Sequence, residues 1–377
     1  WTLGLVLASA ETFFKETFDA GWQSRWVEST WRKDGSLGRF KQSAGLWNVD
    51  PQKDVGIQTS TDYRFYSISA KFPSTSNRDR DLVISFTVKH EQGLDCGGGY
   101  IKLLGDDVDQ ENFGGETPFL IMFGPDICGG DRKTHLLLPY QGKNFLPNKK
   151  FRVESDMFTH EYTAVIRPDN TFSLLIDGIE IAGGALEEYY DFLPPKFIVD
   201  ETAVKPADWV DEPMIEDPAD RKPAGFDDIP EFIPDPSASQ PEDWEEGEWV
   251  PPQIRNPAFT GEWRPRSIPN PSYKGPWAAP KVPNPAYESD PHLYMINSFG
   301  AVGIEIWQVR AGSIFDNIYI GDSLAEAKAF SKDQFEHRKK GEADAKAQFD
   351  DSQEYIRQEL KERVVEDSSD DYEKEEL

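Results

Sequence analysis

The sequence predicts a mostly β protein: an antiparallel β-sandwich, with an extended proline-rich hairpin arm inserted into it and an acidic α-helix after it. Three observations lead to this class. Short strand-like runs fill residues 11–199 and return in 290–321, proline-rich repeats occupy 200–289, and residues 322–377 are rich in the helix formers Ala, Glu, Lys and Gln. Many short strands separated by Gly, Asn and Asp are typical of a sandwich.

The chain is long and strongly acidic. Its 377 residues exceed what one compact core usually holds, so we expect at least two structural units. The formal net charge is -28 at pH 7, and residues 201–250 hold 16 Asp or Glu against 3 Lys or Arg. Such a surface repels nucleic acid and anionic membranes and attracts hard cations that take oxygen ligands. The alternative, that acidic segments only keep the protein soluble, stays open.

The first ten residues are typical of the end of a secretory signal. An apolar run over 3–7 is followed by Ala8-Ser9-Ala10, so we interpret 1–10 as a signal-peptide remnant whose N-terminal signal residues are missing, with the mature protein starting near Glu11. No later apolar run approaches the roughly 20 residues that a membrane span needs. Residues 374–377 read KEEL, one methylene from the KDEL retention signal. Together these features predict a protein of the endoplasmic reticulum lumen.

The globular domain is predicted to be discontinuous. Residues 82–88 are rich in β-branched and aromatic side chains, and the strand-like runs 162–166 and 171–176 flank a turn. The same pattern returns in 301–308 and 314–320. We therefore expect 11–199 and 290–321 to form one lectin-type sandwich, with 200–289 inserted between its two parts.

The inserted segment contains two sets of repeats. The motif KPADW at 205–209 recurs in two related copies about 17 residues apart, and Gly-x-Trp recurs at 247–249, 261–263 and 275–277. Proline at this density prevents helix and regular sheet. A disordered linker is the usual alternative for such a composition. Two successive periods of three copies instead favour a long hairpin, in which copies of the two types pair in reverse order and the tip lies near 246–249.

The C-terminal segment, 322–377, is predicted to be an acidic helix and tail that ends in KEEL. It holds 18 Asp or Glu against 10 Lys or Arg. Its first turns carry enough apolar residues to lie on the sandwich, while the remainder should be solvated. Beyond Val365 the tail is too acidic and too poor in apolar residues to fold alone.

The two cysteines, Cys96 and Cys128, are predicted to form a disulfide, because an even pair in a secreted protein favours one. In the chain-entropy model, closing a loop of about 30 residues stabilises by about 3 to 4 kcal/mol. The five histidines are scattered and supply no metal-binding cluster.

Two longer segments carry a family resemblance. Residues 89–102 (KHEQGLDCGGGYIK) and 121–129 (IMFGPDICG) resemble the signature segments of the calreticulin and calnexin family, and shorter matches occur at 158–160, 167–171, 191–195 and 314–317. Three copies of each repeat without a membrane span are similar to the calreticulin branch. The resemblance implies a jelly-roll, legume-lectin-like sandwich. It also implies a non-enzymatic, calcium-binding lectin chaperone that binds monoglucosylated high-mannose N-glycans and unfolded glycoprotein clients.

A sugar site needs a flat apolar surface and polar groups for the hydroxyls. Tyr100 and Lys102 share one face of a strand, and so do Glu305 and Trp307. Carried over from the resemblance, the sugar contacts are Tyr100, Lys102, Phe119, Met122, Asp126, Leu137, Glu305 and Trp307. Without the resemblance, each is ordinary sheet surface.

Two of these positions depart from the family. Phe119 stands where the family usually has Tyr, and Glu305 stands where it usually has Asp. We therefore expect weaker or altered glycan binding. The alternative is a luminal calcium storage protein with weakened or lost sugar binding.

For calcium, the resemblance implies one tight site on the sandwich. Its ligands would be backbone carbonyls of Thr17, Lys53 and Val55 and the carboxylate of Asp316. Oxygen-only ligation suits Ca²⁺, although Asp316 taken alone reads equally well as a turn residue. Weak sites are implied in the acidic C-terminal region, where the ten basic residues predict a reduced calcium load.

Protein partners are implied at the tip of the arm. Glu246, Glu248 and Trp249 match the family's docking residues for a protein disulfide isomerase family member and a prolyl isomerase. They form an acidic surface with one aromatic anchor. The connection from Trp244 to Trp249 is shorter than usual for the family. We expect a monomer that binds neither nucleic acid nor membrane.

A glycoside hydrolase is the main alternative class, because such enzymes also use sandwiches and need paired carboxylates. Glu305 is a candidate for one of the pair. Gly303 and Trp307 occupy the neighbouring positions on the same strand face and supply no second carboxylate. The sequence therefore favours binding over catalysis.

Overall fold

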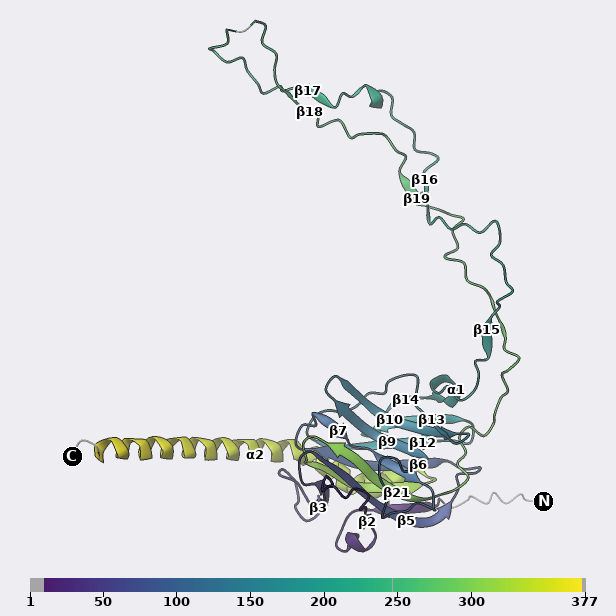
Figure 1. Cartoon of the computed structure of the whole chain (residues 1–377), viewed down its shortest axis with the longest axis vertical. Coiled ribbons are helices and arrows are strands. Elements are labelled where there is room, and N and C mark those ends of the chain that lie inside the picture. The colour runs from purple at the N-terminus through teal and green to yellow at the C-terminus, as the bar shows by residue number, and fades with distance from the viewer. Residues whose placement is uncertain (1–9, 246, 375–377) are drawn as a thin grey trace. The chain divides into compact units, whose positions relative to one another are not determined.

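The computed structural model describes residues 10–245 and 247–374 (Figure 1). The chain divides into two compact units. One is a globular unit that runs up to Pro194 and resumes at Ala286, and the other is the arm, Pro195–Pro285. The sequence placed the bounds of the arm at 200 and 289, a few residues later at each end. None of the described helices combines the length and the apolar character that crossing a membrane requires.

The globular unit contains two eight-stranded antiparallel sheets. In the first sheet the order is β14-β13-β12-β6-β22-β4-β3, and β1 pairs with β22. Its strands are β1 (Thr12–Glu16), β3 (Phe40–Ser43), β4 (Gly56–Thr59), β6 (Leu82–His90), β12 (Thr159–Ile166), β13 (Thr171–Ile176), β14 (Ile179–Ala185) and β22 (Ser313–Gly321).

In the second sheet the order is β11-β10-β9-β7-β21-β5-β2, and β8 pairs with β21 and β9. Its strands are β2 (Val27–Glu28), β5 (Arg64–Thr75), β7 (Cys96–Gly98), β8 (Ile101–Leu104), β9 (Ile121–Cys128), β10 (Asp131–Tyr140), β11 (Lys143–Phe145) and β21 (Phe299–Gln308). Each sheet combines strands that precede the arm in the chain with one strand that follows it, β22 in the first sheet and β21 in the second. The globular unit is therefore discontinuous in sequence.

Alternating apolar residues form one core between the two sheets. On β21 the buried residues Val302, Ile304 and Ile306 belong to this core. Phe86 of the first sheet meets Phe123 of the second edge-to-face, with ring centroids 5.7 Å apart. Because side chains alternate across a strand, the residues between them face away from the core. The predicted antiparallel sandwich is confirmed, and its second sheet has an outward face on which a site can be built.

The arm is a hairpin of short strand pairs. β15 (Phe197–Val199) pairs with β20 (Lys281–Pro283), β16 (Met214–Glu216) with β19 (Ser267–Pro269), and β17 (Phe232–Pro234) with β18 (Gln253–Arg255). The central residue of each strand is apolar and faces another across the pair, as Ile215 faces Ile268. The indole of Trp209 also donates to the Gly275 carbonyl, at 3.1 Å. The first-type repeats therefore pair with the second-type repeats in reverse order, as their periods predict.

Helical structure is sparse except at the C-terminal end. Besides η1 (Trp22–Ser24), α1 (Leu186–Tyr189) and η2 (Phe226–Asp228), the long helix α2 spans Leu324–Lys374. Ala327 packs with Val83, Val165, Leu175 and Tyr319, which are side chains of the first sheet. The buried positions on α2 are Ala327, Ser331, Phe335, Arg338 and Glu342. This spacing forms one helical stripe that lies on the sheet.

The helix α2 continues past Val365, beyond which we expected no folded structure. Extending an existing helix adds one hydrogen bond for each residue fixed, whereas starting a helix is costly. The turns docked on the sheet supply the nucleus, and the Lys, Glu, Gln and Ala background allows the helix to propagate. The expectation treated the tail as an isolated segment and missed this continuity.

Candidate functional site

The outward face of the second sheet brings together five of the residues expected to contact sugar. Lys102 on β8 is paired with Met122 on β9 and with Gly303 on β21, and Met122 is paired with Leu137 on β10. Directly paired residues of antiparallel strands share a face, and so do residues two apart on one strand. Lys102, Met122, Leu137, Glu305 and Trp307 therefore lie on one face, opposite the core side chains of the same strands.

Lys102 and Glu305 form a buried ion pair at the centre of this face. Lys102 Nζ lies 2.7 Å from Glu305 Oε2, and the side chains are only 3% and 9% exposed. The same ammonium lies 4.9 Å from the centre of the Phe119 ring, a cation–π contact. The Phe119 ring thus covers the Lys102 ammonium. The Glu305 side chain, which is one methylene longer than the Asp usual at this position in the family, reaches the same ammonium. We expect Lys102 to hold the Glu305 carboxylate in place, because little of the ammonium is open to a ligand.

Tyr100 and Asp126 form a second polar group on this face. Their link is His135 on β10: its Nε2 lies 2.9 Å from Asp126 Oδ2, and its ring packs edge-to-face on Tyr100 at 5.9 Å. Burial raises the pKa of Tyr100 above its usual value, with a further contribution from the Glu305 and Asp126 carboxylates. The Tyr100 hydroxyl therefore stays protonated at neutral pH and can donate a hydrogen bond. No local pattern in the sequence indicates His135, and its position on this face follows from the pairing of β10 with β9.

Aromatic side chains border the face beside Glu305. The Trp307 ring lies 4.6 Å from the Phe65 ring, and Trp31 meets Phe65 edge-to-face at 5.9 Å. The Arg32 guanidinium lies 4.2 Å from the centre of the Phe65 ring. These contacts hold the Trp307 ring, which has an apolar face, on the same strand face as the Glu305 carboxylate. An apolar ring face beside a carboxylate is the combination that a sugar ring and its hydroxyls require. Sequence reasoning missed Trp31, Arg32 and Phe65 because they lie on different segments from the residues that carry the resemblance.

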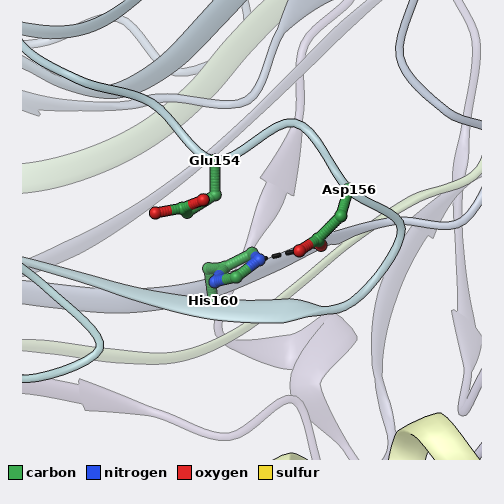
Figure 2. Close-up of side chains that lie close together, drawn as sticks. All are labelled: Glu154, Asp156 and His160. Atoms are coloured by element: carbon green, nitrogen blue, oxygen red, sulfur yellow. Dashed lines mark hydrogen bonds and ion pairs between the residues drawn. The ribbon is translucent and has the colours of Figure 1, made fainter.

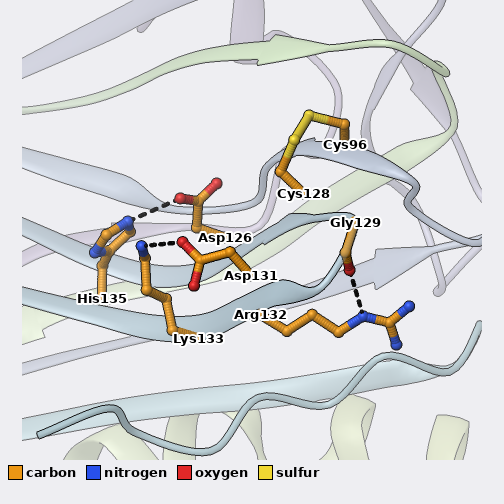
Figure 3. Close-up of a disulfide and its surroundings, with 8 residues drawn as sticks. All are labelled: Cys96, Asp126, Cys128, Gly129, Asp131, Arg132, Lys133 and His135. Atoms are coloured by element: carbon orange, nitrogen blue, oxygen red, sulfur yellow. Dashed lines mark hydrogen bonds and ion pairs between the residues drawn. A yellow bond between two sulfur atoms is a disulfide. The ribbon is translucent and has the colours of Figure 1, made fainter.

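The predicted disulfide between Cys96 and Cys128 is present (Figure 3). It joins β7 to β9 at directly paired positions, and two residues further along, Gly98 is paired with Asp126. Figure 3 also shows the ion pair of Asp131 with Lys133 on β10, 2.7 Å long. The disulfide therefore holds the strand that carries Asp126 in register with the glycine-rich strand before Tyr100.

Three of the expected calcium ligands border one pocket. Thr17, Lys53 and Val55 line an open pocket of about 570 Å³, together with Asp19 and Gln42. Gln42 donates to the Phe18 carbonyl at 2.7 Å, which ties the end of β1 to β3. Backbone and carboxylate oxygens are the ligands that a hard cation prefers.

Asp316, the fourth expected ligand, is buried on β22 and is not among the residues that line this pocket. Asp316 is 1% exposed, and a methyl group built on Gly56, which follows Val55, would lie 3.1 Å from Asp316 Cβ. Asp316 Oδ2 accepts a hydrogen bond from Arg338 at 2.6 Å, while Oδ1 is buried and has no partner among the described residues. Burial raises the pKa of Asp316 to about 7 despite the nearby Arg338. An unpartnered buried carboxylate oxygen close to the loop that borders this pocket fits a bound cation.

A separate cluster of Glu154, Asp156 and His160 has metal-ligating atoms within 4.8 Å of one another (Figure 2). His160 Nε2 lies 2.8 Å from Asp156 Oδ1, and its Nδ1 lies 3.0 Å from Asp177 Oδ2. Burial alone would lower the pKa of His160, but the two carboxylates raise it to about 9. At neutral pH the ring is therefore an imidazolium that donates from both nitrogens and offers no lone pair to a metal.

This cluster predicts a pH-dependent stability. Because the pKa of His160 is higher in the folded protein than in the unfolded chain, protonated His160 stabilises the folded state. This stabilisation is complete below pH 6.5, the unfolded-state pKa, and is lost as the pH rises through about 9, the folded-state pKa. Replacing His160 with glutamine is expected to remove this pH dependence. At low pH the variant should lose at most about 3 kcal/mol of the free energy of unfolding. Urea unfolding of both proteins from pH 6 to pH 10 measures it. The exposed His292→Gln serves as the matched control, and parallel curves for wild type and His160→Gln would contradict the assignment.

At the tip of the arm, Trp249 is half-buried and Glu248 is exposed, while Glu246 lies outside the described residues. The Trp244 indole donates to the Gly247 carbonyl at 3.1 Å, and Gly247 has a positive φ of 62° that favours glycine. The side chain of Val250 is 72% exposed. The tip therefore presents apolar side chains beside an acidic residue.

A family model, two relatives and one solved structure all relate this chain to calreticulins. The calreticulin family model matches residues 13–248 and 246–320. Calreticulin of Dictyostelium discoideum is 50% identical over 349 residues, covering 91% of this chain and 81% of the relative. Calreticulin of Chlamydomonas reinhardtii is 52% identical over 354 residues, covering 92% and 84%. The globular domain of T. cruzi calreticulin is similar in structure, with a TM-score of 0.66, 31% identity, and coverage of 91% of this chain and 100% of that one.

Proposed function

This chain belongs to the calreticulin family of non-enzymatic chaperone lectins, and from that premise we propose that it binds monoglucosylated high-mannose N-glycans on unfolded glycoprotein clients. The proposal rests most on the outward face of the second sheet. There, the ring of Trp307 lies beside the Glu305 carboxylate on one strand, while Asp126 and Tyr100 supply further polar groups from neighbouring segments. An apolar ring surface bordered by fixed hydrogen-bonding groups suits a pyranose.

Loss of the Trp307 ring is expected to weaken glycan binding strongly. A half-buried aromatic on a binding face is typical of a hot spot, so Trp307→Ala should cost about 2 kcal/mol of binding free energy, roughly a 30-fold rise in Kd. Calorimetric titration with a monoglucosylated oligosaccharide measures the change.

The matched control is Tyr355→Ala, which removes an aromatic that is 68% exposed on α2. It should bind as wild type does. A wild-type protein that is not retained on immobilised monoglucosylated glycan would favour the alternative, a luminal calcium storage protein without sugar binding. Release of glucose from the oligosaccharide would indicate a hydrolase.

The second part of the proposal is one tight calcium site on the sandwich. The backbone carbonyls of Thr17, Lys53 and Val55 and the Asp316 carboxylate would hold the ion, which would link the segment after β1 to the loop before β4 and to β22. The shared pocket and the unpartnered Asp316 Oδ1 support this set. Calorimetric titration with Ca²⁺ tests it: Asp316→Asn, which keeps size but removes the charge, should lose the tight component and keep the weak sites of the acidic C-terminal region.

We further propose that the protein acts as a monomer in the endoplasmic reticulum lumen and recruits folding enzymes through the tip of its arm. The partners would be a protein disulfide isomerase family member and a prolyl isomerase that carry basic docking surfaces. The acidic Glu248 and the aromatic Trp249 support this role, because an aromatic anchor beside complementary charge is typical of docking sites. Trp249→Ala should abolish binding of such a partner to the immobilised protein and leave glycan binding unchanged.

A further inference from the structure

The helix α2 places a cation on the carboxylate of the proposed calcium site. Arg338 is 5% exposed, and its Nη2 lies 2.6 Å from Asp316 Oδ2. Its Nε lies 3.4 Å from Asp54 Oδ1. A guanidinium this deeply buried requires both carboxylates as counter-ions, since a buried charge without a partner is costly.

Asp54 connects Arg338 to the loop that would supply calcium ligands. Asp54 Oδ2 accepts hydrogen bonds from the Val49 amide at 2.8 Å and the Asp50 amide at 3.0 Å. Asp54 also lies between Lys53 and Val55 in the chain, so Arg338 contacts both the loop and the carboxylate of the proposed site. Arg338 lies 22 residues after Asp316 in the chain, on α2, whereas Asp316 lies on β22.

We propose that Arg338 sets the calcium affinity of the sandwich, because its guanidinium and Ca²⁺ compete for the Asp316 carboxylate. Calcium binding at this site then loosens the turn of α2 that carries Arg338. The inference rests on the proposed calcium site and adds its regulation by the helix.

The competition follows from charge and geometry. A guanidinium bound to one oxygen of a carboxylate weakens the attraction of that carboxylate for another cation. The guanidinium also repels a divalent ion held at the other oxygen. Burial strengthens this repulsion because water does not screen it. Without Arg338, the Asp54 and Asp316 carboxylates would both be uncompensated near the ion, which favours Ca²⁺. By linkage, calcium weakens the Arg338 contact by the same factor as Arg338 weakens calcium binding.

The rest of the docked helix is held by other partners. Glu342 pairs with Lys89 at 2.8 Å and accepts the Thr159 amide at 2.7 Å, and Lys339 pairs with Asp177 at 3.2 Å. None of these contacts involves Asp316. Calcium is therefore expected to loosen the turn around Arg338 while the helix stays attached through its neighbours.

The test is calorimetric titration of the full chain with CaCl₂ for wild type, Arg338→Gln, Asp316→Asn and Lys339→Gln. Arg338→Gln should bind calcium about tenfold more tightly at the tight site, a coupling of ordinary size. Lys339→Gln removes the neighbouring cation, whose carboxylate partner lies outside the site, and should match wild type. Unchanged or weaker binding by Arg338→Gln would overturn the inference.

Hydrogen exchange on the wild-type protein gives a second measurement that needs no variant. Adding CaCl₂ should speed amide exchange over residues 335–342 and leave exchange over 324–331 unchanged. Slower exchange or no change over 335–342 at saturating calcium would also overturn the inference. A tight site that is lost in Asp316→Asn but unaffected by Arg338→Gln would refute this inference alone, whereas the lack of a tight site in every protein would refute the proposed calcium site itself.

Discussion

Replacing Glu305 with alanine is expected to lower the free energy of unfolding of the globular unit by about 3 to 5 kcal/mol. The change leaves the Lys102 ammonium, 3% exposed, without its carboxylate partner at 2.7 Å. The Phe119 ring alone does not compensate a buried charge. Urea unfolding followed by tryptophan fluorescence measures the loss, and calorimetry with the oligosaccharide should show weaker binding in the same variant.

A double variant separates the ion pair from the packing around it. Lys102→Met with Glu305→Leu removes both charges and keeps similar volumes, so its stability should return close to that of wild type. The surface pair of Glu354 and Arg357, 2.7 Å apart and more than half exposed on both sides, gives the matched control. Glu354→Ala should cost less than about 1 kcal/mol. If Glu305→Ala costs no more free energy of unfolding than Glu354→Ala, Lys102 and Glu305 do not form a buried ion pair.

Removing the disulfide is the other change with a large expected effect. The bond between Cys96 and Cys128 closes a loop across a sequence separation of 32 residues. Cys96→Ala with Cys128→Ala should therefore lower the free energy of unfolding by about 3.5 to 4 kcal/mol in the chain-entropy model. It should also weaken glycan binding, because the bridge holds β7 in register with the part of β9 that carries Asp126.

Reduced wild-type protein is the control for this variant. It lacks the bond but keeps both sulfur side chains, so its unfolding midpoint in urea should match that of the double alanine variant. If the alanine variant unfolds at the midpoint of the oxidised wild type, the disulfide contributes nothing to stability. If reduced wild type is stable and only the alanine variant is not, the loss comes from packing and not from the bond.

Much of the fold could be predicted from local patterns. The strand-like runs on both sides of the arm form the two sheets, because β-branched and aromatic residues with alternating burial favour strands wherever a partner sheet is available. The hairpin of the arm follows from its repeats, since three copies of each type allow the strands of the first set to pair with those of the second in reverse order, as Ile215 with Ile268 and Ile233 with Ile254. The C-terminal helix runs further than composition suggested because docked turns nucleate it.

The candidate site was only partly accessible to the same reasoning. Spacing of two placed Glu305 and Trp307 on one strand face, and the strand pairing agrees with it. The imidazole of His135 and the ring of Phe65 have no comparable local signal. They reach the face because β10 lies beside β9 and β5 beside β21, an order of strands that spacing along one strand does not specify.

The sequence by itself determined the kinds of elements, the disulfide partners and the family, because these depend on composition, periodicity and segments read along the chain. Only the tertiary structure decided which charges meet. Lys102 pairs with Glu305 across 203 residues, and Arg338 of α2 reaches Asp316 on β22. Such pairs depend on the order and register of strands and on the face of a helix that docks, and these follow from the packing of the whole globular unit.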